Sequence, residues 1–167
     1  MVEFRPLNLD VDRDFLLDMF IVRAFESASD QDRRLGLNHY RQRWLDSPEA
    51  MAVSESVEGS LEDKRTIAEV VVVDGTDAGF IWVTFASEPS GVSFAELRIV
   101  AFRLSFQRHG LGRVSVHHVE TEAALHGAEF IRSTGSAATE GIRRFHTSLG
   151  FAPMQTIYEK RLRKPEN

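Results

Sequence analysis

The sequence predicts an α/β protein of the α+β type, in which a mixed, mostly antiparallel central sheet is flanked by helices. Strand-like segments alternate with segments whose apolar residues recur at helical spacing. Three consecutive strand-like segments lie in the middle of the chain, and a hairpin signal joins the first two. The chain has 167 residues, enough for one sizeable core and too few for two ordinary ones. We therefore expect a single domain over residues 1–167.

The first elements are a short strand and a helix. Residues 2–7 alternate between apolar and polar positions as a strand does. Asp10 follows at a position suited to capping a helix. The predicted helix has apolar residues at i, i+4 and i+7, namely Phe15, Met19 and Val22.

A second helix and an irregular segment are predicted next. Residues 30–45 form the weaker helical pattern, and Ser47–Pro48 ends it. The following interval, residues 46–65, is acidic and rich in serine. Its composition predicts a loop.

The central strands are the clearest prediction. Residues 67–73 and 80–86 are apolar, β-branched and aromatic, and the turn-forming run Asp74-Gly75-Thr76-Asp77 separates them. This pattern is typical of an antiparallel hairpin. Residues 93–102 form the third strand of the group.

The remaining elements alternate helix and strand. A helix beginning near Gly112 ends at His126–Gly127, and a strand restarts at Phe130. The apolar stripe assigned to that helix consists of Val114, His118, Val119, Ala123 and Leu125. A last helix, capped by Thr139 and closed by Gly150, precedes a final strand over residues 155–162.

Residues 107–112 predict an anion site. A strand breaks here at two glycines and a helix begins, so backbone N–H groups of the first helical turn lack intrahelical partners. The residues that would surround a pyrophosphate are Gln107, Arg108, His109, Gly110, Leu111 and Gly112. Glycines allow the backbone to approach the anion closely. The segment therefore predicts a nucleotide-like ligand.

Two common phosphate motifs do not fit this loop. A P-loop requires Lys-Ser/Thr after its last glycine, whereas Arg113-Val114 follows here. A dinucleotide fingerprint requires a third glycine, but Ser115 takes that place. The loop therefore belongs to another class.

Two segments resemble the GNAT family of acyl-CoA N-acyltransferases. The order Q-x-x-G-x-G after an apolar strand is similar to the family's acyl-CoA signature. The segment from Thr139 resembles N-x-x-A-x-x-F-Y-x-x-L-G-F, with Phe145, Leu149, Gly150 and Phe151 in matching positions. The predicted element order also matches that fold. The resemblance implies an acetyl-CoA-dependent N-acetyltransferase that transfers acetyl directly to a primary amine.

The resemblance also implies a binding role for several positions. In the family, the strand before the glycine loop is splayed from its neighbour, and its free backbone groups hold pantetheine and the acyl carbonyl. The equivalent residues here are Val100, Ala101 and Phe102. Arg113 either adds a charge near the 3′-phosphate or is a solvated helix residue.

Three further positions have implied roles with open alternatives. Glu96 stands where many members carry a catalytic base, but it could instead pair with Arg98 or another cation. His146 replaces the tyrosine that protonates the CoA thiolate in the family, or it is a satisfied histidine of the helix's inner face. Thr139 replaces an asparagine, and its functions are helix capping first and a CoA contact second.

Composition excludes several other classes. The net charge is -5, with 43% hydrophobic and 27% charged residues, so no basic footprint for nucleic acid is present. No stretch approaches membrane-spanning length, and the amino terminus lacks a signal-peptide pattern. The chain has no cysteine, which removes an acyl-cysteine intermediate. We expect a cytoplasmic protein without metal, although His118, Glu122 and His126 share a helical spacing. A homodimer is possible.

The acceptor and the activity leave alternatives. Aromatic residues Phe25, Tyr40 and Trp44, with the carboxylates Glu26, Asp30 and Asp32 nearby in sequence, would suit a cationic amine. The favoured explanation of Tyr40 and Trp44 is nevertheless that they form the core side of an amphipathic helix. The alternatives to an acetyltransferase are a non-catalytic acyl-CoA-binding or regulatory module, and a transferase of another acyl group shaped by Phe102 and Phe106.

Overall fold

The structure is a computed structural model that describes residues 1–26, 28–63, 65–134 and 140–154. The chain divides into two compact units, Met1–Thr134 and Gly135–Asn167, and each is described by itself. That both belong to one domain, as the chain length predicts, stays a prediction.

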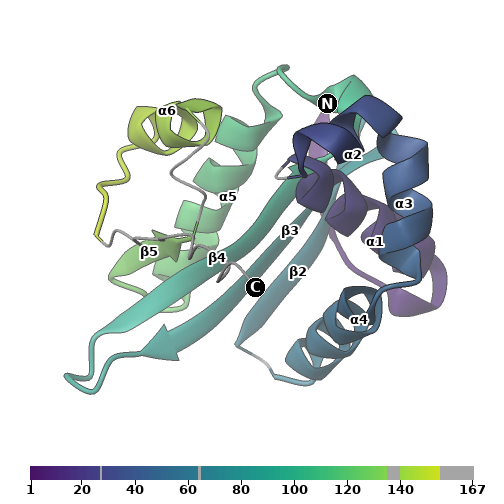
Figure 1. Cartoon of the computed structure of the whole chain (residues 1–167). Helices are drawn as coiled ribbons and strands as arrows, with labels where there is room; N and C mark the ends of the chain where they lie inside the picture. Colours follow the sequence, from purple (N-terminus) through teal and green to yellow (C-terminus); the bar gives the residue numbers. More distant parts are fainter. Residues whose placement is uncertain (27, 64, 135–139, 155–167) are drawn as a thin grey trace, which may run out of the picture. The chain divides into compact units, whose positions relative to one another are not determined.

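One sheet forms the centre of the first unit (Figure 1). Among the described residues it has five strands in the order β1-β2-β3-β4-β5. Adjacent strands from β1 to β4 are antiparallel, whereas β5 is parallel to β4. The predicted mixed, mostly antiparallel sheet is confirmed. The strands are β1 (Val2–Pro6), β2 (Thr66–Val73), β3 (Thr76–Ser87), β4 (Ser93–Phe102) and β5 (Phe130–Ser133).

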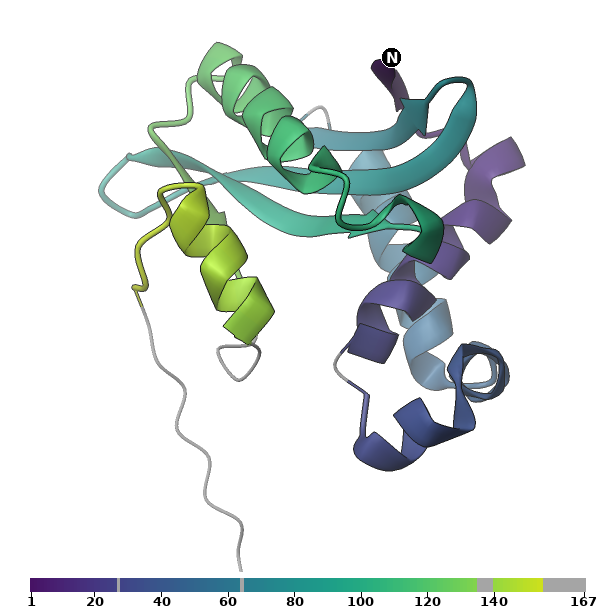
Figure 2. The same ribbon diagram turned by 90° about the horizontal axis from the view of Figure 1, so that it is seen from above.

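Helices cover both faces of this sheet (Figure 2). On one face, Leu16 of α1 and Val57 of α4 join the core formed with Phe80 and Ile99 of the sheet. On the other face lies α5, whose Val119 is fully buried. The helices of this unit are α1 (Leu9–Glu26), α2 (Asp30–Leu35), α3 (Leu37–Leu45), α4 (Pro48–Leu61) and α5 (Leu111–Leu125).

The hairpin between β2 and β3 is tighter than the four-residue turn that the sequence predicts. Asp74 and Gly75 have φ values of 48° and 78°, and Thr76 already pairs with Val73. Positive φ at both central residues matches the right-handed twist of the flanking strands, and glycine adopts it without strain.

The prediction of a loop over residues 46–65 is wrong, because α4 occupies most of it. Pro48 suits the first helical turn, where its missing N–H costs nothing. Ala50 and Val57 are buried on the sheet side, and Val53 packs against the same core. The acidic and serine residues between them occupy the remaining positions of an amphipathic helix.

The single helix predicted over residues 30–45 is two helices. Gly36, with φ of 87°, ends α2 and precedes α3. Ser29 caps α2 by accepting a hydrogen bond from the backbone N–H of Asp32 at 3.1 Å. A left-handed glycine between the two segments interrupts the helical hydrogen bonding that periodicity alone would continue.

Two details of helix packing also differ from the predictions. Asn8, rather than Asp10, caps α1, since its side-chain oxygen accepts from the N–H of Asp10 at 3.1 Å. In α5, Val114 and Leu125 are 44% and 75% exposed. The buried residues of α5 instead follow the stripe Leu111, Ser115, Val116, Val119 and Ala123. Val119 and Ala123 of the predicted stripe are therefore confirmed as buried, whereas Val114 and Leu125 are not.

The second unit contains α6 (Glu140–Ser148), followed by a turn at Gly150. Thr139 and the final strand predicted over residues 155–162 lie outside the described residues. Among the residues that the structure describes, no helix is long and apolar enough to cross a membrane.

An ion pair with a buried carboxylate ties β1 to α1. Arg5 donates to both carboxylate oxygens of Asp12, at 2.7 and 2.8 Å, and also to Asp77 at 3.0 Å. Asp12 is only 4% exposed and also accepts from the N–H of Asn8. The hydrogen bonds from Arg5 hold the pKa of Asp12 below its usual range. The contribution of Asp12 to stability is therefore present above the unfolded pKa and lost as pH falls through the lower folded value.

We expect Asp12→Asn to lower the free energy of unfolding by about 2–3 kcal/mol at pH 7, because it removes charged hydrogen bonds. The deficit should shrink as pH falls below about 4, because the unfolded chain then binds a proton at Asp12, and it should vanish once the folded carboxyl, whose pKa is lower, is protonated as well. Urea denaturation across pH measures both effects. Asp10→Asn, in the same helical turn but exposed, is the control and should change stability by less than about 0.5 kcal/mol. A deficit independent of pH would contradict this account.

Candidate active site

The edge of β4 opens halfway along the strand. Pairing with β5 extends from Phe94 to Leu97. Beyond Leu97, the described residues give β4 no strand partner on that side, although β3 continues to pair with it as far as Phe102. The backbone of Val100 to Phe102 therefore forms the kind of open edge that the GNAT resemblance implies.

A β-bulge accompanies this opening. Val83 pairs with Leu97 and Trp82 pairs with Ile99, so Arg98 is an extra residue on β4. A bulge bends its strand and increases the local twist. The bend occurs where pairing with β5 ends, which gives a physical reason for the separation of the two strands.

The glycine loop joins this edge to α5. A short 3-10 turn, Leu104–Phe106, comes first, and the side-chain amide of Gln107 then donates to the carbonyl of Phe102 at 3.1 Å. Gln107 thus fastens the loop to the end of β4. Arg108 and Gly110 both have positive φ, at 64° and 78°.

The amino terminus of α5 has unused donors. Gly110 is its N-cap residue, and no side chain caps the helix. The described residues provide no acceptor for the backbone N–H groups of residues 109–112. His109 and Arg113 are exposed beside them. This arrangement of amides, helix dipole and cationic side chains is suited to a phosphate.

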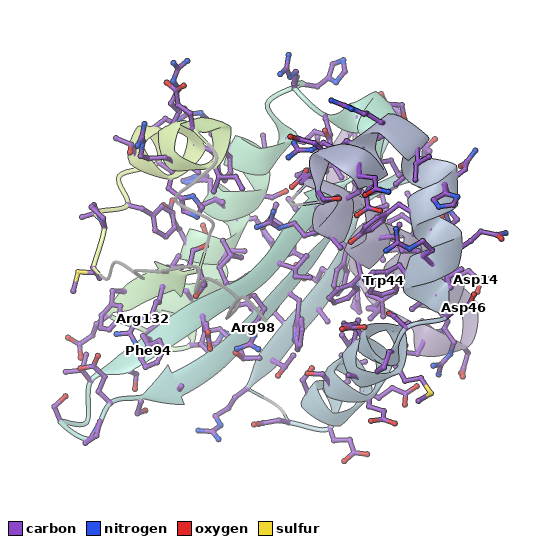
Figure 3. The ribbon with its side chains drawn as sticks, in the orientation of Figure 1. Asp14, Trp44, Asp46, Phe94, Arg98 and Arg132 are labelled. Carbon is purple, nitrogen blue, oxygen red and sulfur yellow. The ribbon has the colours of Figure 1, made fainter. Side chains whose placement is uncertain are left out.

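Glu96 has a partner within the same strand. Its carboxylate oxygen lies 3.1 Å from the Nη1 atom of Arg98, and the two side chains are 30% and 43% exposed. The guanidinium of Arg98 lies 5.4 Å from the centre of the Trp82 ring. Figure 3 shows Arg98 on the sheet surface, with Phe94 and Arg132 further along it. The alternative of an ion pair with Arg98 therefore describes Glu96 in this structure.

His146 lies in α6 of the second unit. Its Nδ1 donates to the carbonyl of Ile142 at 2.8 Å, which places a proton on that nitrogen. The rings of Phe145 and Phe151 meet its ring edge-on, with centroids 5.7 and 5.3 Å away. Glu96 and the glycine loop belong to the first unit, so His146 is described separately from them.

The predicted acceptor wall is mostly structural. Trp44 packs against the core, and Tyr40 contacts the Phe25 ring at 5.4 Å. Burial raises the pKa of Tyr40 above its usual value. The nearby carboxylates are neutralised by arginines, in the pairs Glu26–Arg23, Asp30–Arg33 and Asp32–Arg43. The core interpretation of these aromatic residues therefore fits better than a cationic-acceptor surface.

The histidines of α5 are engaged separately. Nε2 of His118 donates to Glu69 at 2.7 Å, and its ring stacks on Phe4. Nδ1 of His126 donates to the carbonyl of Glu122 at 2.8 Å. Within the described ranges, no three metal-binding side chains lie together.

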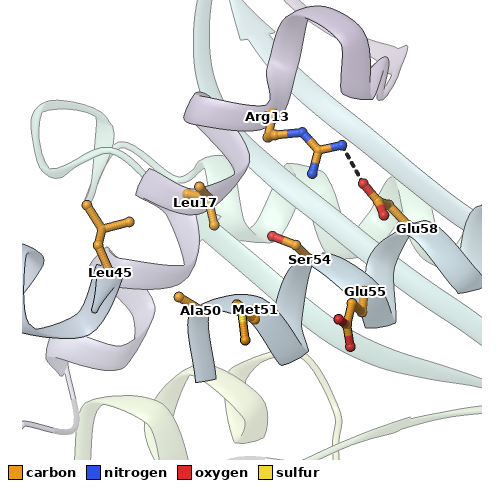
Figure 4. Close-up of a pocket in the computed structure, with 8 residues that line it drawn as sticks. All are labelled: Arg13, Leu17, Leu45, Ala50, Met51, Ser54, Glu55 and Glu58. Carbon is orange, nitrogen blue, oxygen red and sulfur yellow. Dashed lines mark hydrogen bonds and ion pairs between the residues drawn. The ribbon is translucent and has the colours of Figure 1, made fainter. Parts of the chain in front are cut away.

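A cavity of about 380 Å³ lies outside these segments. Leu17 of α1 and Met51 of α4 contribute to its lining, and the ion pair of Arg13 with Glu58 lies at one side (Figure 4). None of the predicted site residues lines it. The candidate active site is therefore the open edge of β4 with its glycine loop.

Three solved structures share this fold at low sequence identity. A transcriptional regulator from Bacillus halodurans C-125 has a TM-score of 0.69 and 18% identity, covering 97% of this chain and 100% of its own. An aminoglycoside acetyltransferase from an uncultured soil metagenomic sample has a TM-score of 0.66 and 13% identity, with coverages of 98% and 97%. A predicted acetyltransferase from Clostridium acetobutylicum, solved with acetyl-CoA, has a TM-score of 0.69 and 11% identity, with 96% of each chain covered.

The three structural similarities show that the chain has an acetyltransferase-type fold. A comparison of its sequence with family profiles shows which family it belongs to. The profile described as "Acetyltransferase (GNAT) family" matches residues 23–151, well over half of the chain. The chain belongs to the GNAT acetyltransferase family, whose members use acetyl-CoA as co-substrate. No curated protein matches its sequence.

Proposed function

We propose that the chain is an acetyl-CoA-dependent N-acetyltransferase that transfers acetyl directly to a primary amine in a ternary complex. The observation that carries this proposal is the open backbone edge at Val100–Phe102, followed after one 3-10 turn by the uncapped amides of residues 109–112. The first can hold a thioester and the second its pyrophosphate. Family membership supports the same combination.

Binding in this proposal uses the backbone and a few side chains. The backbone N–H groups of residues 109–112 donate hydrogen bonds to the pyrophosphate oxygens, with Arg108, His109 and Arg113 supplying further donors. Backbone groups of Val100 to Phe102 hold pantetheine and the acyl carbonyl. A backbone N–H directed at the carbonyl oxygen would stabilise the tetrahedral intermediate as an oxyanion hole does. Thr139 is a further candidate CoA contact.

Chemistry requires three proton transfers. A lysine-like amine has a pKa near ~10.4 and is almost fully protonated at neutral pH, so a base must expose its lone pair. Glu96 takes this first proton in the proposal. The amine nitrogen then bonds to the acyl carbon and loses a second proton to solvent. The carbon–sulfur bond breaks, and His146 gives a proton to the departing thiolate. The products are an N-acetylated amine and CoA.

We expect Glu96→Gln to retain acetyl-CoA affinity and to lower kcat by about 10²–10⁴ at pH 7, the usual contribution of a general base. The gap should narrow as pH approaches the pKa of the acceptor, because the amine then loses its proton unaided. Thiol release against a panel of primary amines measures the rate, and calorimetry measures the affinity. Glu120→Gln, an exposed glutamate of α5 paired with His117, should leave both unchanged.

A second candidate function is an acyl-CoA-binding module without efficient chemistry. The ion pair of Glu96 with Arg98 favours it, since a base engaged by an arginine is less available to an acceptor. Equal turnover by Glu96→Gln across pH would remove Glu96 as the base. Acetyl-CoA binding without thiol release from any amine would favour the binding module.

A further inference from the structure

Arg98 occupies a special position on β4. It is the extra residue of the bulge, lying between Leu97, which pairs with Val83, and Ile99, which pairs with Trp82. Bulges commonly redirect a side chain next to an active site. Two residues further along the strand, Val100 begins the edge at which the thioester is proposed to lie.

The guanidinium of Arg98 is only partly used by the protein. Among the described residues, its partners are one carboxylate oxygen of Glu96, at 3.1 Å, and the face of the Trp82 ring, whose centre is 5.4 Å away. A guanidinium has five N–H donors in a planar fork that matches a carboxylate. Trp82 is only 6% exposed, and its ring supports one side of the guanidinium. In contrast, 43% of the Arg98 side chain is exposed. A planar two-nitrogen edge thus remains for an external anion.

Glu96 and Arg98 together present opposite charges side by side. A free amino acid carries the complementary pair, an ammonium and a carboxylate separated by a few bonds. Glu96 would receive the ammonium, whose proton it must remove, and Arg98 would receive the carboxylate. With a rise of about 3.3 Å per residue, Arg98 lies roughly 7 Å along the strand from Val100. An amine bound between them would therefore lie near the thioester.

The other charges agree with this acceptor class. The carboxylates on α1 and α2 that suggested a purely cationic acceptor are paired with arginines. Arg132 adds a second exposed cation on the same side of the sheet, with its guanidinium 4.3 Å from the centre of the Phe94 ring. Glu88 pairs with Arg132 at 2.8 Å, so this second cation is partly neutralised.

We propose that the acceptor is an amino acid or a similar small molecule with a carboxylate a few bonds from its amine, and that Arg98 binds this carboxylate. The inference rests on the proposed N-acetyltransferase function and specifies its substrate class. Arg98 is a specificity-determining residue in this proposal. Polyamines, aminoglycoside-like amines and protein amino groups lack the neighbouring carboxylate and are disfavoured.

The first test compares acceptors that differ only in the carboxylate. Thiol release from acetyl-CoA is measured with free amino acids, their carboxamides and spermidine. We expect kcat/KM for at least one amino acid to exceed that of its carboxamide and of spermidine by tenfold or more. Arg98→Gln should raise KM for the amino acid by at least tenfold while leaving the carboxamide unaffected. Equal use of acid and amide, or a preference for spermidine, overturns the proposal.

A matched control and a second variant separate recognition from folding. Asp63–Arg65 is another acid–arginine pair at the same spacing, outside the candidate site, with nitrogen and oxygen 3.6 Å apart. Arg65→Gln should therefore leave the acid-to-amide preference unchanged. Arg98→Lys retains the charge without the planar fork, so it should keep part of the preference. Loss of the preference in Arg65→Gln would contradict a specific role for Arg98.

A binding measurement keeps this inference distinct from the proposed chemistry. The chain has two tryptophans, so Trp44→Phe leaves Trp82, beneath Arg98, as the sole tryptophan. In the presence of CoA, N-acetylated amino acids should shift Trp82 fluorescence in a saturable manner, and their carboxamides should not. Arg98→Gln should abolish the shift. This result would support the carboxylate site even if no amine released thiol, whereas identical titrations with acid and amide would overturn it.

Discussion

Gly110→Glu should abolish acetyl-CoA binding, with at least a hundredfold loss of affinity. Gly110 caps α5 and adjoins the backbone amides that have no described acceptor. A glutamate would bring a negative charge to the positive end of the helix dipole and compete with the pyrophosphate for the amides. Calorimetric titration with acetyl-CoA measures the change. Retained affinity would contradict the location of the anion site.

The controls for Gly110→Glu separate charge from backbone strain. Gly110 has φ of 78°, a backbone conformation that strains any residue with a side chain. A Cβ at this position meets open space, so a substitution adds no steric clash. Gly110→Gln has the same shape without the charge and should bind more tightly than Gly110→Glu. Gly75 has the same φ of 78° and the same open surroundings in the β2–β3 turn. Gly75→Glu should cost about 1–2 kcal/mol of stability and leave acetyl-CoA affinity intact.

Gly79→Ala should lower stability substantially. Gly79 of β3 pairs with Phe102 of β4, and a Cβ there would lie 2.3 Å from a ring carbon of Phe102 and 2.6 Å from the carbonyl oxygen of Ala101. A backbone oxygen cannot move aside as a flexible side chain does. We expect a loss of about 2–3 kcal/mol in the free energy of unfolding, measured by urea denaturation.

The same substitution should also weaken acetyl-CoA binding, because relief of the clash moves the backbone of Ala101 and Phe102 at the proposed thioester edge. Gly59→Ala in α4 is the matched control. A Cβ there meets open space in a helix, so this change should stabilise by about 0.5–1 kcal/mol and leave binding unaffected. Unchanged stability and affinity in Gly79→Ala would show that the two strands adjust freely at this point.

The sequence predicted the part of the fold that local chemistry determines. The strand at residues 93–102, the glycine loop and the helix after it follow from alternation and from glycines at a strand–helix junction. Residues 46–65 misled the prediction because their acidic and serine-rich composition resembles a loop. Only the burial of Ala50 and Val57 against the sheet makes that segment a helix. Gly36 misled the prediction in a similar way, because the helical pattern of residues 30–45 continues across it although the helix ends there.

The candidate site was predicted less completely than the fold. The GNAT resemblance suggested Glu96, whose catalytic role stays a prediction, and its ion pair depends on where the bulge places Arg98. Polar and apolar residues alternate from Glu96 to Ile99 as in a regular strand, so nothing in the sequence marks a bulge at Arg98. The presence of an arginine, Arg98, within a mostly apolar strand was the feature that could have marked this residue as functional. A glycine inside β3 was the corresponding signal for Gly79, whose close contact with Phe102 requires the strand pairing to be known.

Calorimetric titration of the unmodified chain with acetyl-CoA, followed by thiol release against amines in the same sample, tests the central claim most directly. We expect micromolar binding and amine-dependent release of CoA thiol, with amino acids among the best acceptors. Binding without release would contradict the proposed chemistry and leave the anion site standing. Absence of binding would contradict the assignment of the glycine loop and the open β4 edge as an acyl-CoA site.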